Sequence, residues 1–81
     1  MKVILSKEAQ KSYTHFPISE QKKIKKRLLA LIDYPYIGKK LEGQLSQYRS
    51  IRAWPYRIIY QVNDDKQRIE VSNIVHRQGA Y

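Results

Sequence analysis

The residues best suited to chemistry are cations and phenols that gather in the C-terminal half of the chain. They are Arg49, Arg52, Arg57, His76, Arg77 and Tyr81. An arginine stays protonated at physiological pH, so Arg57 and Arg77 can hold a phosphate group but cannot take up a proton. Histidine exchanges its proton near neutral pH, which makes His76 a candidate acid or base. Tyr81 could act as a base among cations or as a stacking surface for a nucleobase.

This set of side chains suits the cleavage of RNA by its own 2′-hydroxyl group. In that reaction a base removes the 2′ proton, cations stabilise the added charge on phosphorus, and an acid protonates the departing 5′ oxygen. Each residue also has a structural alternative. His76 could simply end a strand, Arg57 could point outward from a half-exposed sheet, and Tyr81 could be a frayed terminus.

Other catalytic constellations lack their residues. With no Cys and two His, a structural zinc site is short of ligands. Asp64 and Asp65 stand in a predicted turn, and Glu42 and Glu70 have no evident partner for paired-carboxylate chemistry. The three glycines are too scattered to form a phosphate-binding loop. We therefore expect neither a metal ion nor a cofactor.

The charge balance of the chain points to an anionic partner. Sixteen Lys and Arg residues against seven Asp and Glu give a net charge of +9 in 81 residues. A field of this sign attracts nucleic acid, and it attracts an acidic protein equally well. Charge alone leaves both alternatives open.

The length and the N-terminus predict one small domain, residues 1–81, in the cytoplasm. The sequence MKVILSKEAQ has an apolar run of three residues, which is too short for a signal peptide or a membrane span. We therefore expect a soluble protein that is not exported.

The first half of the chain predicts elements that support the charged residues. Residues 2–5 favour a short strand, and Ser6 is placed to cap a helix over residues 7–15, before Pro17. A second helix has its predicted cap at Ser19 and ends near residues 33–35. Its buried face is predicted from apolar residues at helical spacing, namely Ile24, Leu28, Leu31 and Ile32.

The second half predicts an antiparallel sheet. A loop over residues 35–43, which contains Lys39 and Lys40, leads to strands over about 45–53, 56–62 and 67–75. The order strand, helix, helix and three strands predicts an α+β fold with two helices packed on a mainly antiparallel sheet. The place of the first strand in the sheet stays open.

Alternation along the strands assigns the charges to faces. In the strand 56–62 it places Arg57 opposite the apolar face that carries Ile58 and Tyr60. A charge among apolar neighbours avoids desolvation if it faces a solvent-filled cleft, so we expect Arg57 in one. In the strand before it, Tyr48 and Arg52 share one face and Arg49 lies on the other.

The C-terminal half resembles the RelE/ParE superfamily of bacterial type II toxin–antitoxin toxins. The segments that carry the resemblance are Leu41-Glu42-Gly43, Tyr48-Arg49 with Arg52, the run YRIIYQV over residues 56–62, and His76-Arg77 followed by Tyr81. No single segment is specific for this superfamily, but the order and spacing of the segments together are fairly specific for it. With the N-terminal strand and helices, the resemblance spans nearly the whole chain.

The resemblance implies a RelE-like, microbial ribonuclease-type fold. For the RelE-like branch it implies a ribosome-dependent mRNA endonuclease that a cognate antitoxin neutralises. The roles it carries over are phosphate stabilisation by Arg57 and Arg77 and stacking or activation by Tyr81. The ParE branch instead blocks DNA gyrase without cutting RNA, and a basic module that binds RNA without cutting it is a third possibility. The ending HRQGAY favours the RelE-like branch.

The chain also departs from the RelE-like pattern. The lysine pair that some of these toxins carry falls at Tyr48 and Ser50, which cannot supply the charge, and Arg49 or Arg52 could substitute. Some members use histidines, which keeps His76 as a catalytic candidate. The predicted substrate-binding residues are Lys39, Lys40, Tyr48, Arg49 and Arg52.

Overall fold

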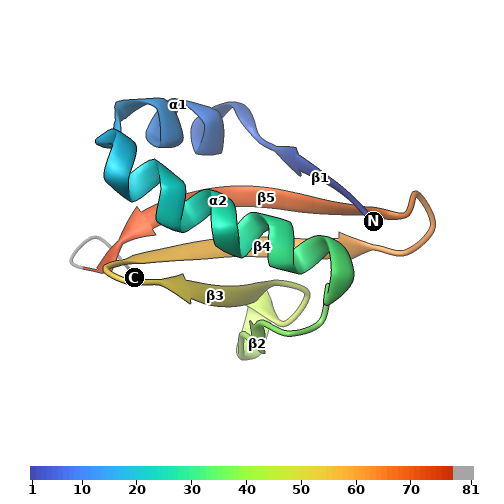
Figure 1. Cartoon of the computed structure of the whole chain (residues 1–81). Coiled ribbons are helices and arrows are strands. Elements are labelled where there is room, and N and C mark those ends of the chain that lie inside the picture. Colours follow the sequence, from blue (N-terminus) through green and yellow to red (C-terminus); the bar gives the residue numbers. More distant parts are fainter. Residues whose placement is uncertain (78–81) are drawn as a thin grey trace.

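Apolar residues that alternate along the C-terminal strands build a sheet, and two helices cover one of its faces (Figure 1). This computed structural model describes residues 1–77. In chain order the elements are β1 (Lys2–Leu5), α1 (Lys7–His15), α2 (Ile18–Asp33), β2 (Lys39–Lys40), the short 3-10 helix η1 (Gly43–Leu45), β3 (Arg49–Ala53), β4 (Tyr56–Asn63) and β5 (Arg68–His76). The predicted α+β fold is confirmed.

The sheet has five strands in the order β1-β5-β4-β3-β2. β3, β4 and β5 form the predicted antiparallel meander, and β2 pairs antiparallel with β3. β1 runs parallel to β5 at the edge of the sheet, with Val3 opposite Ile69. The pairing places β1, which the sequence left open. Within residues 1–77, neither helix is long and apolar enough to cross a membrane.

The start of α1 is fixed by Ser6, as predicted. Its Oγ accepts a hydrogen bond from the Ala9 N–H at 3.0 Å, which satisfies one of the free donors at the helix N-terminus. The same hydroxyl donates to the Ser72 carbonyl oxygen at 2.6 Å. One serine therefore caps α1 and ties it to β5.

The predicted cap of α2 at Ser19 and Glu20 is wrong. The helix begins at Ile18 behind Pro17, which makes no side-chain hydrogen bond as the N-terminal cap. The Pro17 carbonyl accepts the N–H groups of Glu20 and Gln21, both at 2.9 Å. Glu20 instead pairs with Lys23 at 3.0 Å, one turn later. Proline fits here because a helix start needs no N–H donor from it.

The main core lies between the helices and the inner face of the sheet. Its buried residues come from both helices and from three strands: Ala9, Ile24, Leu31, Ile51, Ala53, Ile58, Tyr60, Ile69, Val71 and Ile74. Ile24 and Leu31 confirm the predicted stripe on α2, and Leu28 is half-buried beside them. Ile32 does not follow the prediction, because it is 39% exposed at the end of the helix.

Two boundaries in the middle of the chain differ from the prediction. Lys39 and Lys40 form the edge strand β2 instead of a loop. The strand predicted from residue 45 begins at Arg49, because Gly43 turns with φ +68° into η1 and the chain only then straightens. Tyr48 thus lies just before β3.

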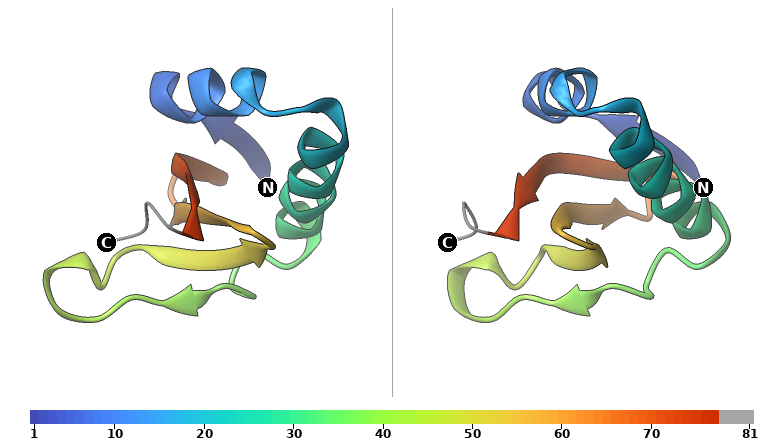
Figure 2. Two further views of the ribbon diagram at one scale, coloured as in Figure 1. Left: turned by 90° about the vertical axis from the view of Figure 1, so that its left-hand side faces the viewer. Right: turned by 60° about the vertical axis from the view of Figure 1, so that its left-hand side comes forward.

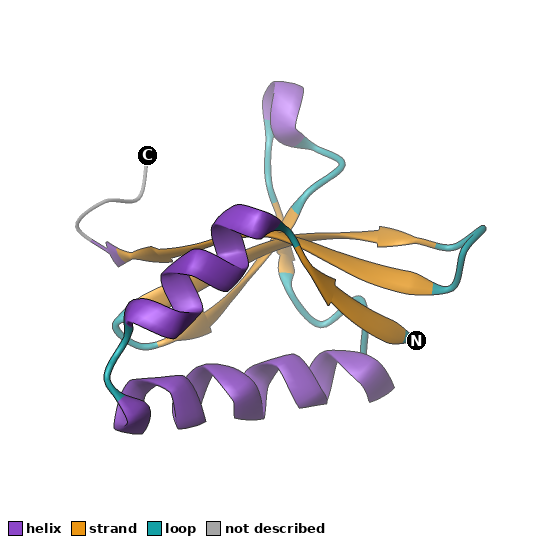
Figure 3. Ribbon diagram, turned by 90° about the horizontal axis from the view of Figure 1, so that it is seen from above, coloured by secondary structure: helices purple, strands orange, loops and turns teal. Residues whose placement is uncertain are grey.

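The two faces of the sheet are covered differently. Seen from above, α2 and η1 lie on opposite sides of the sheet (Figure 3). The side views show the β2–β3 loop, which carries η1, projecting away from α2 (Figure 2). We call the face turned away from α2 the open face, because no α-helix among residues 1–77 covers it.

Tyr60 joins the core to the loop that follows α2. Its side chain is fully buried, and its hydroxyl accepts the Gly38 N–H and donates to the Pro35 carbonyl, each at 2.9 Å. A Cβ at Gly38 would lie 2.5 Å from that hydroxyl, so only glycine fits there. Burial raises the pKa of Tyr60 above its ordinary value. The loop position therefore depends on a protonated Tyr60.

Replacing Tyr60 with Phe should lower the free energy of unfolding by about 1–3 kcal/mol, because a buried N–H and a carbonyl lose their partner. Tyr34→Phe, at a side chain that is 65% exposed, should change little and is the control. Urea unfolding at neutral pH measures both.

The raised pKa of Tyr60 adds a pH dependence. The unfolded chain releases this proton first, so the stabilisation is complete below about pH 10 and is lost as pH rises through the folded-state value. Wild type should therefore lose more stability above pH 10 than Tyr60→Phe does. Equal losses would show that Tyr60 is not held protonated.

Candidate functional site

The open face carries Arg57 in a position that its strand pairing defines. In β3 and β4, Arg52 stands directly opposite Arg57, and Ser50 stands opposite Ile59. Directly paired residues of antiparallel strands point to the same face. Arg57 therefore lies with Arg52 on the face away from the core, as the alternation predicted.

Arg52 and Arg57 form a cross-strand pair of like charges, which we call the arginine pair. Like charges in this arrangement destabilise a sheet. Arg52 is exposed and Arg57 is half-buried, and within residues 1–77 neither side chain has a hydrogen bond or an acidic partner. The ion pairs of the described chain join Glu20 to Lys23 and Arg68 to Glu70. The charge of the arginine pair is thus not balanced by an acidic side chain of residues 1–77.

Glu70, an acid on the open face, is held away from the arginine pair. Glu70 accepts from Arg68 Nε at 2.6 Å and from Gln61 Nε2 at 3.2 Å. The Arg68 hydrogen bond lowers the pKa of Glu70 below its ordinary value, although partial desolvation opposes the shift. Gln61 lies four residues from Arg57 along β4, about 13 Å away. Glu70 therefore does not neutralise the pair.

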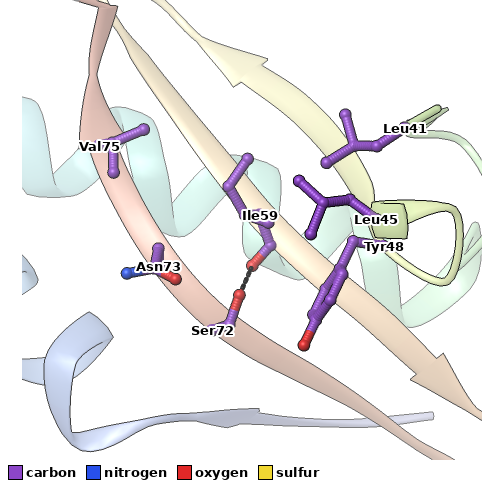
Figure 4. Close-up of a pocket in the computed structure, with 7 residues that line it drawn as sticks. All are labelled: Leu41, Leu45, Tyr48, Ile59, Ser72, Asn73 and Val75. Carbon is purple, nitrogen blue, oxygen red and sulfur yellow. Dashed lines mark hydrogen bonds between the residues drawn. The ribbon is translucent and has the colours of Figure 1, made fainter. Parts of the chain in front are cut away.

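An open hollow of about 470 Å³ adjoins the arginine pair on the same face. Figure 4 shows Ile59 at its floor, with the β2–β3 loop on one side and β5 on the other. The lining residues are Leu41, Leu45, Tyr48, Ile59, Ser72, Asn73 and Val75. Val75 pairs with Arg57, so the hollow and the arginine pair are neighbours on the sheet.

A β-bulge shapes the β5 side of the hollow. Ile59 pairs with Asn73 and Tyr60 with Val71, so Ser72 is an extra residue in β5. A bulge redirects side chains and is common beside functional sites. Here it lets the consecutive residues Ser72 and Asn73 both line the hollow, while Val71 stays in the core.

Arg77 lies at the same end of the sheet as the arginine pair. Its guanidinium carbon is 4.8 Å from the centre of the Trp54 ring, a cation–π geometry, and its N–H donates to the Pro55 carbonyl at 2.9 Å. Arg77 follows Val75 by two residues and is exposed. The structure therefore gathers Arg52, Arg57 and Arg77 at one end of the sheet.

His76 lies on the other face of the sheet from Arg57. It pairs with Tyr56, and the two rings meet edge to face with centroids 5.5 Å apart. Tyr56 in turn packs on Phe16, with centroids 4.3 Å apart, beside the helices. The structure thus does not bring His76 and Arg57 together, although the sequence grouped them.

Arg49 is engaged in a structural contact. Its Nη1 donates to the carbonyls of Gly38 at 3.0 Å and Tyr36 at 3.3 Å, and its guanidinium carbon is 5.2 Å from the Tyr36 ring centre. It shares the inner face with Ile51, away from Arg52. Of the two expected substitutes for a lysine pair, only Arg52 lies beside Arg57.

The remaining predicted site residues have different positions. Tyr48 lines the hollow. Lys39 is exposed and pairs with Ser50, which puts it on the open face, whereas Lys40 is exposed opposite Arg49. Tyr81 lies outside the described residues.

Sequence reasoning missed Ser72 and Asn73, although a signal was present. The buried residues of β5 are Ile69, Val71 and Ile74, spaced by two and then by three. A strand that alternates regularly keeps a spacing of two, so the extra residue marks a bulge. The two polar residues in that gap are the ones that line the hollow.

Replacing Arg52 with Gln should leave the free energy of unfolding unchanged or raise it by a few tenths of a kcal/mol, because a like-charge contact is removed. The gain should shrink with added salt. Arg68→Gln is the matched control, since it removes an arginine that has an acidic partner and should destabilise. Urea unfolding at low and high salt compares them. A loss in Arg52→Gln as large as in Arg68→Gln would contradict the assignment of a repulsive pair.

Comparison with known proteins shows the family of the chain. Residues 3–81 match the model of the ParE toxin of type II toxin–antitoxin systems, parDE. Toxin RelE of Mycobacterium tuberculosis is 33% identical over 52 residues, which cover 63% of this chain and 54% of that toxin. The match thus spans about half the length of the curated relative.

Solved structures show the same fold. The RelBE2 toxin–antitoxin complex of Mycobacterium tuberculosis contains a chain with TM-score 0.85 and 22% identity, over 94% of this chain and 96% of that one. The YoeB dimer of Staphylococcus aureus gives TM-score 0.69 and 29% identity, over 90% and 92%. With its family model matched over nearly its whole length, the chain belongs to the ParE toxin family of type II toxin–antitoxin systems.

Proposed function

We propose that this toxin is a RelE-like endonuclease that cuts mRNA on the ribosome and so inhibits translation. The observation that carries the proposal is the arginine pair on the open face, which has no acid beside it among residues 1–77. Two unpaired guanidinium groups on adjacent strands give many N–H donors for phosphate oxygens.

The reaction adds the 2′ oxygen of ribose to phosphorus and breaks the bond from phosphorus to the 5′ oxygen. A base takes the 2′ proton, and an acid gives a proton to the 5′ oxygen. The products are a 2′,3′-cyclic phosphate and a 5′-hydroxyl end. Negative charge on the phosphoryl oxygens rises in the transition state, so cations fixed beforehand lower the barrier.

Arg57 and Arg52 are the proposed stabilisers of that charge, and Arg77 is a third cation at the same end of the sheet. Arg57 matters most, because a half-buried cation acts through less water than an exposed one. No metal ion or cofactor takes part in this mechanism. Tyr81 stays the candidate for proton transfer, because His76 lies on the other face of the sheet from Arg57.

In the part of the chain that the structure describes, no histidine lies on the open face beside Arg57, and this fits a dependence on the ribosome. Within residues 1–77, His15 and His76 are the histidines, and His76 shares the face of Tyr56 while His15 ends α1. The arginine pair therefore stabilises a phosphate without a neutral-pH base beside it in the described chain. A site of this kind gains from a partner that presents the RNA with its 2′ oxygen already aligned. The ribosome is the proposed partner, and the RelE-like resemblance supports it.

A cognate antitoxin is the second proposed partner. The complex from Mycobacterium tuberculosis pairs a chain of this fold with its antitoxin. A net charge of +9 favours an acidic segment that covers the cations. An antitoxin laid over the open face would block the arginine pair and the hollow together, and cytoplasmic action follows from the ribosomal target.

The alternative is inhibition of DNA gyrase without nuclease activity. The description of the matching family model as a ParE toxin is the observation that favours it. A basic module that binds RNA without cutting it is a third possibility. Both predict intact mRNA.

Arg57→Ala should lower the rate of mRNA cleavage on translating ribosomes by about 10²–10³-fold, as expected for the loss of one fixed donor to a developing oxyanion. Arg27→Ala, which removes an exposed arginine from α2, is the control and should keep its rate. Mapping of new 5′-hydroxyl ends measures cleavage, and circular dichroism checks the fold.

Full cleavage by Arg57→Ala would place the site elsewhere. If purified wild type leaves ribosome-bound mRNA intact but stops supercoiling by gyrase, the ParE-like alternative holds. Salt-dependent binding of RNA without new ends would instead favour the binding module.

Arg77→Ala should abolish growth arrest while antitoxin binding is retained.

Removal of Tyr81 should slow the cutting step more than it weakens ribosome affinity. Single-turnover kinetics separates these two effects. A variant without Tyr81 that cuts at the wild-type rate would remove this residue from the mechanism.

A further inference from the structure

The hollow on the open face has the composition of a ligand site. Its floor and one wall are apolar, formed by Ile59, Leu41 and Leu45, and the Tyr48 ring stands at its rim (Figure 4). Ile59 is 8% exposed yet does not belong to the main core, so it is covered from the open face. Small-molecule sites are mostly apolar with a few placed polar groups, and here these groups are Ser72 and Asn73.

Both polar groups offer acceptors to the hollow, because the Ser72 hydroxyl and the Asn73 amide nitrogen each donate a hydrogen bond to another group. The Ser72 hydroxyl donates to the Ile59 carbonyl at 3.2 Å. The Asn73 amide nitrogen donates to Glu8 Oε2 at 3.3 Å. An ionised carboxylate only accepts, so Glu8 fixes the amide nitrogen toward α1 and turns the carbonyl oxygen away. Figure 4 shows that oxygen on the Ile59 side of Asn73.

We propose that the hollow binds a nucleobase that carries an exocyclic amino group, with the Asn73 carbonyl oxygen as its acceptor and the Tyr48 ring as its apolar wall. The inference rests on the proposed function, because it takes the phosphate at the arginine pair to belong to RNA. Arg57 and Ile59 are two residues apart on β4, about 7 Å, as are Val75 and Asn73 on β5. A ribose bridges a phosphate and a base over such a step.

The acceptor decides which bases fit. Adenine and cytosine present an amino group on the edge that pairs with other bases, and it donates to Asn73. Uracil and hypoxanthine present a carbonyl there, which would leave two acceptors facing each other without a donor. Sites built for a hydrogen bond reject analogues that lack it, so Asn73 is a specificity residue and takes no part in proton transfer.

The test compares two nucleotides that differ at this group, adenosine 3′-monophosphate and inosine 3′-monophosphate. Titration of the full-length protein, followed by NMR of backbone and side-chain amides, measures both affinities. Wild type should bind the adenosine compound about tenfold more tightly, a difference of about 1.4 kcal/mol. The shifted amides should include those of Ile59, Ser72 and Asn73.

Variants separate recognition from folding. Asn73→Ala should bind both nucleotides equally, and Glu8→Ala should reduce the preference because the Asn73 amide is free to turn. Tyr48→Ala should weaken both nucleotides alike, while Tyr48→Phe keeps the wall. Gln61→Ala, an amide on the same face beside Glu70, is the control and should keep the preference.

Equal affinity of wild type for the two nucleotides would overturn the inference. So would a preference that survives in Asn73→Ala with unchanged size. The outcomes differ from those for the proposed function. If the protein distinguishes the two nucleotides but does not cleave mRNA, the nucleobase site stands and the nuclease proposal is wrong. If it cleaves mRNA but binds both nucleotides equally, only the nucleobase site is wrong.

Discussion

The pairing of β3 with β4, which holds Arg52 opposite Arg57, is the constraint on which the open face depends. Two cations held opposite each other on adjacent strands lower the stability of the sheet. Other contacts, which fix β3 and β4, outweigh this cost. The pairing is continuous from Arg49 opposite Tyr60 to Ala53 opposite Tyr56, and the inner faces of both strands are buried under α2. Burial of apolar residues on the helix side stabilises the sheet by more than the like-charge pair on the open face destabilises it.

The supporting contacts converge on the loop between α2 and β2. Tyr60 bonds Gly38 and Pro35 from within the core, and Arg49 bonds Gly38 and Tyr36 from β3. This loop sets where β2 begins and hence where the next loop, with Leu41 and Leu45, closes the hollow. The hollow and the arginine pair therefore share one support, although they bind different parts of the proposed substrate.

The sequence predicted those features that follow from local periodicity. Alternation in residues 56–62 was enough to place Arg57 opposite Ile58, and the stripe on α2 was enough to find Ile24 and Leu31. Ile32 is exposed although Leu31 in the same turn is fully buried, because consecutive helix residues point about 100° apart and Ile32 lies at the side of the stripe. A helical period alone does not show how wide the buried stripe is.

Features that depend on the register between strands could not be predicted from local patterns in the sequence. His76 shares a face with Tyr56, and Arg52 stands opposite Arg57, only because β3, β4 and β5 pair as they do. Arg49 and Arg52 look equivalent as charges, yet alternation sends one to the loop carbonyls and the other to the open face. The position of β1 beside β5 likewise depends on a long-range pairing that no local pattern specifies.

In the proposed reaction a 2′ oxygen attacks a phosphate held by the arginine pair. A direct test uses translating ribosomes whose mRNA carries one 2′-deoxy nucleotide on the 5′ side of the cleaved bond. Wild-type toxin should cut the unmodified mRNA, leaving a 2′,3′-cyclic phosphate detectable by mass spectrometry, and should spare the 2′-deoxy mRNA at that bond. Cleavage of the 2′-deoxy mRNA at the same bond and rate would contradict this mechanism.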